Sequence, residues 1–337
     1  MHIPDILNWY GIRAAELGKE MREKGGIERH QSWRLEYYEN PYLLLVSDEE
    51  LQQRFIDLHA NVVELNEDGK IVPNPMISHQ DDLIWRNWTQ AVEAFNSRGG
   101  LQGDLIGKAN TEIGKYFRDG EPPGVAMFKG MPRVLKDHIV KFSERKHLEP
   151  MLRFGRIRLL PASGYRNGNL LKSMVDIELE RLLRVPAIRA ALSGQNTVSI
   201  RGKMLPIEGG AVSLRIMATD YHLFSTCREM DRRMPTDFRA DGALVIKDAK
   251  RFTDQFRNAY KKTFGQSDVL GGEVNYFDPF RPPKNMRQPE FFKHFAFSYQ
   301  KEHRIVARPF LASISPEPIF LEIGSLEEYC EIVPSPR

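Results

Sequence analysis

The sequence predicts an α+β protein in which a helical N-terminal region precedes a region of short strands and helices. Apolar residues recur every three or four positions through most of residues 4–98, which is the spacing of one helix face. Beyond about residue 135, short β-branched and aromatic runs are separated by turn residues. These runs do not alternate regularly with helices, which argues against a doubly wound parallel sheet.

Capping residues and glycines mark where the predicted N-terminal helices begin and end. A helix over 4–24 ends at Gly25-Gly26, because glycine readily adopts the left-handed conformation that follows a helix. The sequence Ser-Asp-Glu-Glu at 47–50 is a capping box that opens a helix to about residue 65. Ser78–Asp81 opens a third helix that Gly99-Gly100 ends, and 103–118 forms a weaker fourth one.

A Gly- and Pro-rich segment at 118–132 is the best candidate boundary between domains. We therefore expect a helical N-terminal module over 1–118, a linker over 119–135 and an α+β domain over 136–337. Connecting segments without regular hydrogen bonding usually run over the surface, so this segment should be exposed.

The second region mixes short strands and helices. We expect strands at 138–142, 156–161, 197–200, 203–207, 221–226, 243–247, 274–277, 304–307 and 319–323. We expect helices at 143–154, 170–193 and 249–263. The strands at 197–200 and 203–207 flank Arg201-Gly202 and predict a hairpin. The last helix carries Phe252, Phe256 and Tyr260 at four-residue spacing, which predicts one buried face.

Composition narrows the protein classes. The chain has 337 residues and two cysteines, Cys227 and Cys330, which excludes a disulfide scaffold and fits a reducing compartment. No uncharged apolar run is long enough for a membrane helix, and the N-terminus lacks the features of a secretory signal, so we expect a cytoplasmic protein without a membrane partner. The phosphate-binding, dinucleotide-binding, zinc-protease and hydrolase motifs are missing, and the histidine spacings predict no metal site.

The charge is unevenly distributed along the chain. Residues 1–135 hold 15 basic and 21 acidic residues, a net charge of −6, whereas residues 136–337 hold 33 and 24, a net charge of +9. A basic C-terminal region suits an anionic ligand such as a dinucleotide, a phosphate or a nucleic acid. A mildly basic solvated surface explains the same excess.

The C-terminal region resembles a large family of bacterial domains of unknown function. The family hallmark is Lys-His followed by an aromatic residue and Tyr-x-x-Glu-x-Arg-x-Val, which this chain supplies as Lys293-His294, Tyr299, Glu302, Arg304 and Val306. The resemblance extends over about 136–333. It departs at 163–168, where the family has Asn-Asp-Pro and this chain does not.

The order of the segments also resembles the ADP-ribosyltransferase plan. Those enzymes carry a basic or aromatic residue on a first strand, Ser or Thr on a second, and Gln/Glu-x-Glu on a later one. The matching residues here are Lys141 or His138 with Ser143, then Ser225-Thr226, then Gln300-Lys301-Glu302. The resemblance implies an ADP-ribosyltransferase-like fold that uses NAD as substrate and needs no metal.

The resemblance also implies roles for these residues. Glu302 would be the catalytic carboxylate that stabilises an oxocarbenium-like transition state, and Gln300, two positions earlier on the same strand face, would orient the acceptor. The residues that would bind NAD are Lys141, Ser143, Ser225, Thr226, Tyr299 and Arg304. The competing interpretation is a structural ion pair between Glu302 and Arg304 on one strand face.

The preferred function is a cytoplasmic bacterial or phage-related effector that cleaves NAD or transfers ADP-ribose to a protein or nucleic acid. Relatives by this resemblance often serve as toxins or in antiviral defence. The first alternative is a non-catalytic module that binds nucleic acid or a nucleotide. The second is an interaction protein whose N-terminal helices dock a partner protein.

Overall fold

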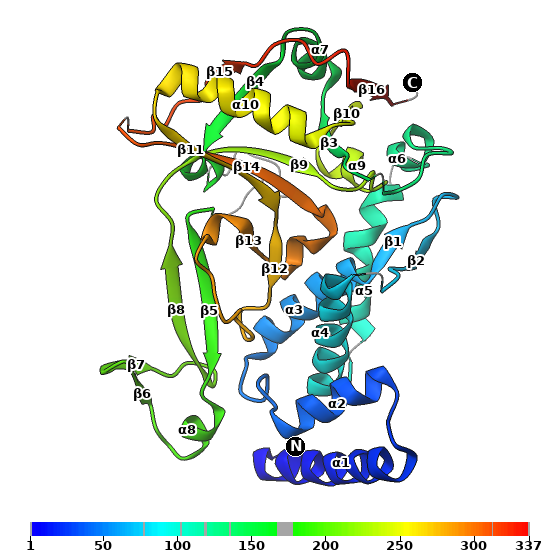
Figure 1. Ribbon diagram of the computed structural model, residues 1–337. Coiled ribbons are helices and arrows are strands. Elements are labelled where there is room, and N and C mark those ends of the chain that lie inside the picture. Colours follow the sequence, from blue (N-terminus) through cyan, green and yellow to red (C-terminus); the bar gives the residue numbers. More distant parts are fainter. Residues whose placement is uncertain are drawn as a thin grey trace.

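The computed structural model describes residues 2–76, 78–101, 103–117, 120–134, 136–166, 178–311 and 313–335. It confirms the α+β class and the helical N-terminal region. Figure 1 shows the main sheet beneath α10, the N-terminal helices beside and below the sheet, and a long two-stranded ribbon that extends away from it.

Two of the five N-terminal helices begin at the predicted caps. The helices are α1 (Ile3–Lys24), α2 (Arg29–Glu39), α3 (Asp48–Asn61), α4 (His79–Asn96) and α5 (Gly103–Gly114). Ser47 caps α3 by accepting the Glu50 N–H at 3.2 Å, and Ser78 with Asp81 forms a reciprocal capping box on α4. The sequence analysis missed α2, although its buried Trp33 and Tyr37 have helical spacing.

An eight-stranded antiparallel sheet forms the centre of the C-terminal region. Its strands are β3 (Ile139–Ser143), β4 (Arg156–Pro161), β9 (His222–Cys227), β10 (Gly242–Ile246), β11 (Ser267–Glu273), β14 (Glu302–Pro309), β15 (Ile319–Glu322) and β16 (Cys330–Pro334). The order is β11-β14-β9-β3-β10-β16, with β4 beside β9 and β15 beside β4. The three strands that the resemblance singles out, β3, β9 and β14, are therefore neighbours.

The two faces of this sheet differ in chemistry. The helices α7 (Arg145–Phe154) and α10 (Ala249–Phe264) cover one face, where Phe252 and Phe256 pack on Phe224 and Ile305 in an apolar core. The alternation of side chains along β14 then turns Glu302 and Arg304 to the opposite face. Glu302 and Arg304 therefore lie on the side of the sheet away from α10. The covered face also holds polar groups, such as His222, which bonds to Tyr260 of α10 at 2.7 Å.

One prediction is wrong in the two-stranded ribbon, which consists of β5 (Glu180–Pro186) and β8 (Ala211–Met217). The helix expected over 170–193 falls partly on 170–177, which lie outside the described residues. Residues 180–186 form the strand β5, which pairs along its whole length with β8. Only Ile188–Leu192 is helical, as α8. Long-range pairing and the alternate burial of Arg181 and Leu183 outweigh the helical spacing of the leucines.

The predicted hairpin is confirmed as β6 (Thr197–Ile200) and β7 (Lys203–Pro206). Short elements complete the described chain: β1 (Val63–Leu65), β2 (Ile71–Pro73), η1 (Lys115–Phe117), α6 (Pro123–Met127), η2 (Ala162–Arg166), α9 (Met234–Asp237), β12 (Asn275–Phe277), η3 (Pro289–Phe291), β13 (Phe292–His294) and η4 (Phe295–Gln300).

The segment expected to be an exposed linker is packed in its middle. Residues 118 and 119 lie outside the described part of the chain. The described residues Val125, Met127 and Phe128 are buried, and Phe128 packs edge-on against Phe142 of β3. A Cβ on Gly124 would lie 2.2 Å from the Arg232 carbonyl oxygen, so glycine allows this close approach. The expected exposure is therefore wrong for this stretch.

The N-terminal helices and the C-terminal region share one core. Phe280 and Phe295 belong to the apolar cluster that α1, α3 and α4 form. Within this core, Arg54 of α3 makes a two-pronged ion pair with Asp278, at 2.9 and 2.5 Å, and both side chains are at most 5% exposed. Opposing the effect of burial, the Arg54 charge lowers the pKa of Asp278 below its usual value.

This pair yields a prediction about stability. Asp278→Asn leaves the Arg54 charge buried without its partner, so the free energy of unfolding should fall by about 3–5 kcal/mol. Replacing both residues with apolar ones (Arg54→Met, Asp278→Leu) should recover part of that loss. Urea denaturation measures both variants. Glu331→Gln, which breaks the half-exposed pair with Lys247, is the control and should change stability by about 0–1 kcal/mol. A similar loss in the control and in Asp278→Asn would contradict the assignment.

Candidate active site

A cavity of about 160 Å³ opens on the sheet face away from α10. Six of the eight residues predicted to act in catalysis or NAD binding line it: Lys141, Ser143, Ser225, Thr226, Gln300 and Glu302. Three further polar residues, Tyr165, Glu178 and Lys293, complete the polar part of its wall. The remaining two predicted residues, Tyr299 and Arg304, lie next to it without lining it.

The cavity forms where β9 changes its partner. Near its end β9 pairs with β3, with Val140 opposite Cys227, and near its start it pairs with β4, with Leu160 opposite Leu223. Between these points the carbonyl of Ser225 accepts a hydrogen bond from Lys141 Nζ at 2.8 Å. A lysine side chain thus takes the place of a strand partner. Burial lowers the pKa of Lys141, and the opposing charge of Glu302 only partly offsets this.

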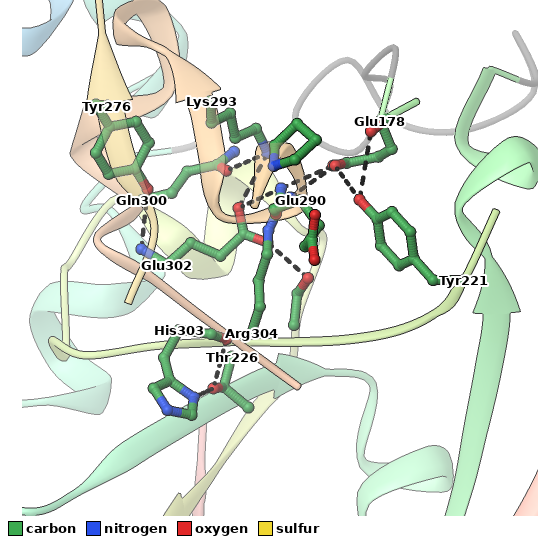
Figure 2. Close-up of polar contacts among 12 residues, drawn as sticks. Glu178, Tyr221, Thr226, Tyr276, Glu290, Lys293, Gln300, Glu302, His303 and Arg304 are labelled. Carbon is green, nitrogen blue, oxygen red and sulfur yellow. Dashed lines mark hydrogen bonds and ion pairs between the residues drawn. The ribbon is translucent and has the colours of Figure 1, made fainter. Parts of the chain in front are cut away.

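Four donors surround the Glu302 carboxylate (Figure 2). Its Oε1 accepts from Ser225 Oγ at 2.6 Å and from Arg304 Nε at 2.8 Å. Its Oε2 accepts from Lys293 Nζ and from Arg304 Nη2, both at 3.1 Å. A carboxylate has about four acceptor sites, so protein groups occupy all of them here.

This arrangement keeps Glu302 ionised. Burial alone would raise its pKa, but the charges of Arg304 and Lys293 and the hydrogen bonds from Arg304 and Ser225 hold the pKa well below its usual value. A carboxylate that does not take up a proton near neutral pH is a poor general base. It is well suited to act as a fixed negative charge.

Arg304 links Glu302 to Glu178, which lies two residues before β5 of the ribbon. Its guanidinium is fully buried and reaches both carboxylate oxygens of Glu178, at 2.7 and 2.8 Å, as well as Glu302. It also donates to the carbonyl of Glu290 at 2.6 Å. The ion pair between Glu302 and Arg304 is therefore present, and Glu302 also lines the cavity, while its catalytic role stays a prediction. The pair is not on a flat surface strand face, because both side chains are buried.

Lys293 is one of two charged residues in the cavity wall that are not among the predicted site residues. It lies on β13 and is 4% exposed, and its ammonium binds Gln300 Oε1 and Glu302 Oε2, each at 3.1 Å. Lys293 belongs to the Lys-His pair of the sequence hallmark, but no local pattern links it to Glu302. Glu178 was missed as well, because nothing in the sequence separates it from the other acidic residues near it.

Gln300 reaches the site by a different route from the one predicted. It ends the 3₁₀ helix η4 and does not lie on the strand, so it does not share a strand face with Glu302. Lys301 between them has a left-handed backbone, with φ of 42°, which interrupts the extended conformation. The turn still brings Gln300 and Glu302 to the same ammonium group of Lys293.

The other predicted residues have structural partners. The Thr226 hydroxyl donates to the carbonyl of His303 at 3.0 Å, and the ring of Tyr299 packs under the guanidinium of Arg233. His138, the alternative to Lys141, is partly buried and directly precedes β3. Tyr165 lies in the loop that lacks Asn-Asp-Pro, and it lines the cavity. Residues 167 and 168 of that loop lie outside the described residues.

The described residues contain no cluster of His, Cys, Asp and Glu arranged to hold a metal ion. No helix in the described ranges is long and apolar enough to cross a membrane. Comparison with family models, with curated proteins and with solved structures gave no match.

A buried histidine beside the site predicts a pH dependence of stability. Burial lowers the pKa of His303 to about 4, against about 6.5 in an unfolded chain. The unfolded state then binds more protons below pH 6.5, so the stability that His303 contributes is complete above pH 6.5 and is lost as the pH falls to about 4.

Urea denaturation between pH 7 and pH 4.5 tests this dependence. The free energy of unfolding should decrease with falling pH, and His303→Gln should reduce the slope by up to about 1.4 kcal/mol per pH unit. His147→Gln, a change at an exposed position on α7, is the control and should leave the slope unchanged. An unchanged slope in His303→Gln would contradict the prediction.

Proposed function

We propose that this protein consumes NAD, with the Glu302 cavity binding the nicotinamide-ribose end of the dinucleotide. The bond between the nicotinamide nitrogen and ribose C1′ breaks, and its electron pair leaves with nicotinamide. An acceptor on a protein or nucleic acid, or water, then attacks C1′ and loses a proton. The product is an ADP-ribosylated macromolecule or free ADP-ribose.

One observation carries the proposal. A buried carboxylate that stays ionised lies in the wall of a small cavity and is fixed by Ser225 from the neighbouring strand. Bond cleavage at C1′ develops positive charge on the ribose. A preoriented carboxylate in a water-poor site stabilises such charge far more than water does.

The dimensions of the cavity fit one ring. A cavity of roughly 150 Å³ holds benzene, so about 160 Å³ suits nicotinamide but not a whole dinucleotide. The adenosine and diphosphate would then extend outward past Ser143 and Lys141. The Ser225 hydroxyl is the one neutral donor on Glu302, and its rotation would free Oε1 for a ribose hydroxyl.

The strand order supports the same function. Strands β3, β9 and β14 are sheet neighbours, so Lys141, Ser225 and Glu302, which the ADP-ribosyltransferase resemblance matches along the chain, all line one cavity. On that resemblance we place the protein in the cytoplasm, as a bacterial or phage-related effector in a toxin or antiviral system. Gln300, which shares the Lys293 ammonium with Glu302, would then orient the acceptor.

A non-catalytic nucleotide-binding module is the second candidate. It is favoured by the four protein donors on Glu302, which leave no acceptor site open to a substrate without rearrangement. In that case NAD or another nucleotide would bind without losing nicotinamide.

Glu302→Gln tests the proposal, because it keeps the volume and removes the charge. Nicotinamide release from NAD, with cell extract as acceptor source, should fall about 100-fold or more. The NAD affinity, measured by calorimetry, should stay within about fivefold. Since the change also leaves Arg304 and Lys293 with less compensation, thermal melting must show that the variant is folded at the assay temperature.

Glu290→Gln is the matched control. Glu290 is also a buried carboxylate paired with an arginine, Arg308 at 3.0 Å, but it does not line the cavity, so activity should stay near that of the wild type. Binding of NAD without nicotinamide release by the wild-type protein would favour the second candidate. If the wild-type protein neither binds NAD nor releases nicotinamide, both candidate functions are overturned. Tight retention of nucleic acid that weakens steeply with salt and ignores NAD would favour a nucleic-acid module.

A further inference from the structure

The segment that leads into Glu302 is short, irregular and held from outside. It runs from Phe295 through the 3₁₀ helix η4 to Lys301, which has the left-handed backbone described above. A 3₁₀ helix has poor hydrogen-bond geometry, and a lysine in the left-handed region is strained. Such a conformation persists only where surrounding groups fix it. Several of those groups come from the N-terminal helices, in addition to the Arg228 N–H, which donates to the Lys301 carbonyl at 2.8 Å.

Asn61, the last residue of α3, holds the middle of this segment. Its Oδ1 accepts from Ser298 Oγ at 2.7 Å and from the Tyr299 N–H at 2.8 Å. Its Nδ2 donates to the Ala296 carbonyl at 3.0 Å and to the Asp57 carbonyl of its own helix at 2.7 Å. The side chain is 2% exposed, and three of these four bonds go to the segment. Only one orientation of the amide satisfies all four.

Asp81 of α4 holds the end of the segment. Its Oδ1 lies 2.6 Å from Lys301 Nζ, in a pair whose side chains are 13% and 8% exposed. Its Oδ2 accepts from the N–H and the hydroxyl of Ser78 and so closes the cap of α4. One carboxylate therefore joins the start of an N-terminal helix to the strained residue directly before Glu302.

We propose that the N-terminal helical region positions the candidate catalytic segment, with Asn61 and Asp81 as its positioning residues. The left-handed turn at Lys301 is what brings Gln300 and Glu302 to the one ammonium of Lys293. Removing the contacts of either Asn61 or Asp81 lets the turn at Lys301 relax, and the side chains of Gln300 and Glu302 then move. The catalytic part of this inference rests on the proposed function, whereas the structural part does not.

Amide hydrogen exchange tests the structural part without any substrate. The variants are Asn61→Ala and Asp81→Asn, the second of which keeps an oxygen for the helix cap. The amides of Lys301 and Glu302 bond to Ser298 O and Tyr276 Oη and not to Asn61 or Asp81. In both variants these two amides should exchange about tenfold faster or more, at a temperature where each variant remains folded.

Gln90→Ala is the matched control. Gln90 is a fully buried amide of α4, and its hydrogen bonds go to Trp33, Glu36 and Tyr42 within the N-terminal region. It should lower the melting temperature without changing exchange at 301 and 302. Equal exchange at these two amides in Asn61→Ala, Asp81→Asn and Gln90→Ala would overturn the proposal.

Steady-state kinetics test the catalytic part. Asn61→Ala should lower kcat for nicotinamide release about tenfold or more while KM for NAD stays within about threefold, and Gln90→Ala should keep both. Faster exchange with unchanged kcat in an active enzyme would overturn the positioning role. Faster exchange in a protein whose wild type releases no nicotinamide would leave the structural tie standing and would remove the proposed function.

Discussion

The buried charges around Arg304 constrain this structure more than any other feature. A fully buried guanidinium is tolerable only if its charge is matched and its donors are bonded. Glu178, Glu302 and the carbonyl of Glu290 meet that requirement from three separate stretches of chain. Each of these stretches must therefore take its position for the others to be stable. The ion pairs of the site are therefore part of the scaffold.

This constraint gives Glu302 a specific chemical character. Positive groups on both of its oxygens keep it charged, and the low dielectric of its surroundings strengthens its effect on a nearby developing cation. The same contacts remove its ability to accept a proton near neutral pH. A reaction that needs a fixed negative charge fits this residue, whereas one that needs a general base does not. Cleavage at ribose C1′ belongs to the first kind.

The N-terminal helices extend the constraint. Arg54, Asn61 and Asp81 lie on two helices, and each reaches a polar group of the region between β12 and β14. The apolar core common to both regions adds Phe280 and Phe295. The irregular chain before Glu302 is therefore packed between its own sheet and these helices. This packing explains how a strained residue such as Lys301 is kept in place.

The sequence alone determined what depends on neighbours along the chain. Helix starts at Ser47 and Ser78, the buried stripe Phe252–Tyr260 and the hairpin around Arg201-Gly202 follow from capping, periodicity and turn chemistry, which act over a few residues. The resemblance to the ADP-ribosyltransferase plan also singled out Glu302, Ser225 and Lys141, which line one cavity. The sequence did not predict how deeply these residues are buried or which groups they contact.

Only the tertiary structure decided the rest, because the deciding contacts join residues far apart in the chain. Residues 180–186 are a strand since they pair with 211–217, against the helical spacing of their own leucines. Lys293 and Glu178 belong to the site because β13 and the start of the ribbon come up beside β14. Gln300 lies outside β14 because the left-handed backbone of Lys301 interrupts the extended chain. On our proposal that turn depends on Asn61 and Asp81, which lie more than 200 positions earlier in the sequence. Local patterns carry no information about which distant group will satisfy a buried charge.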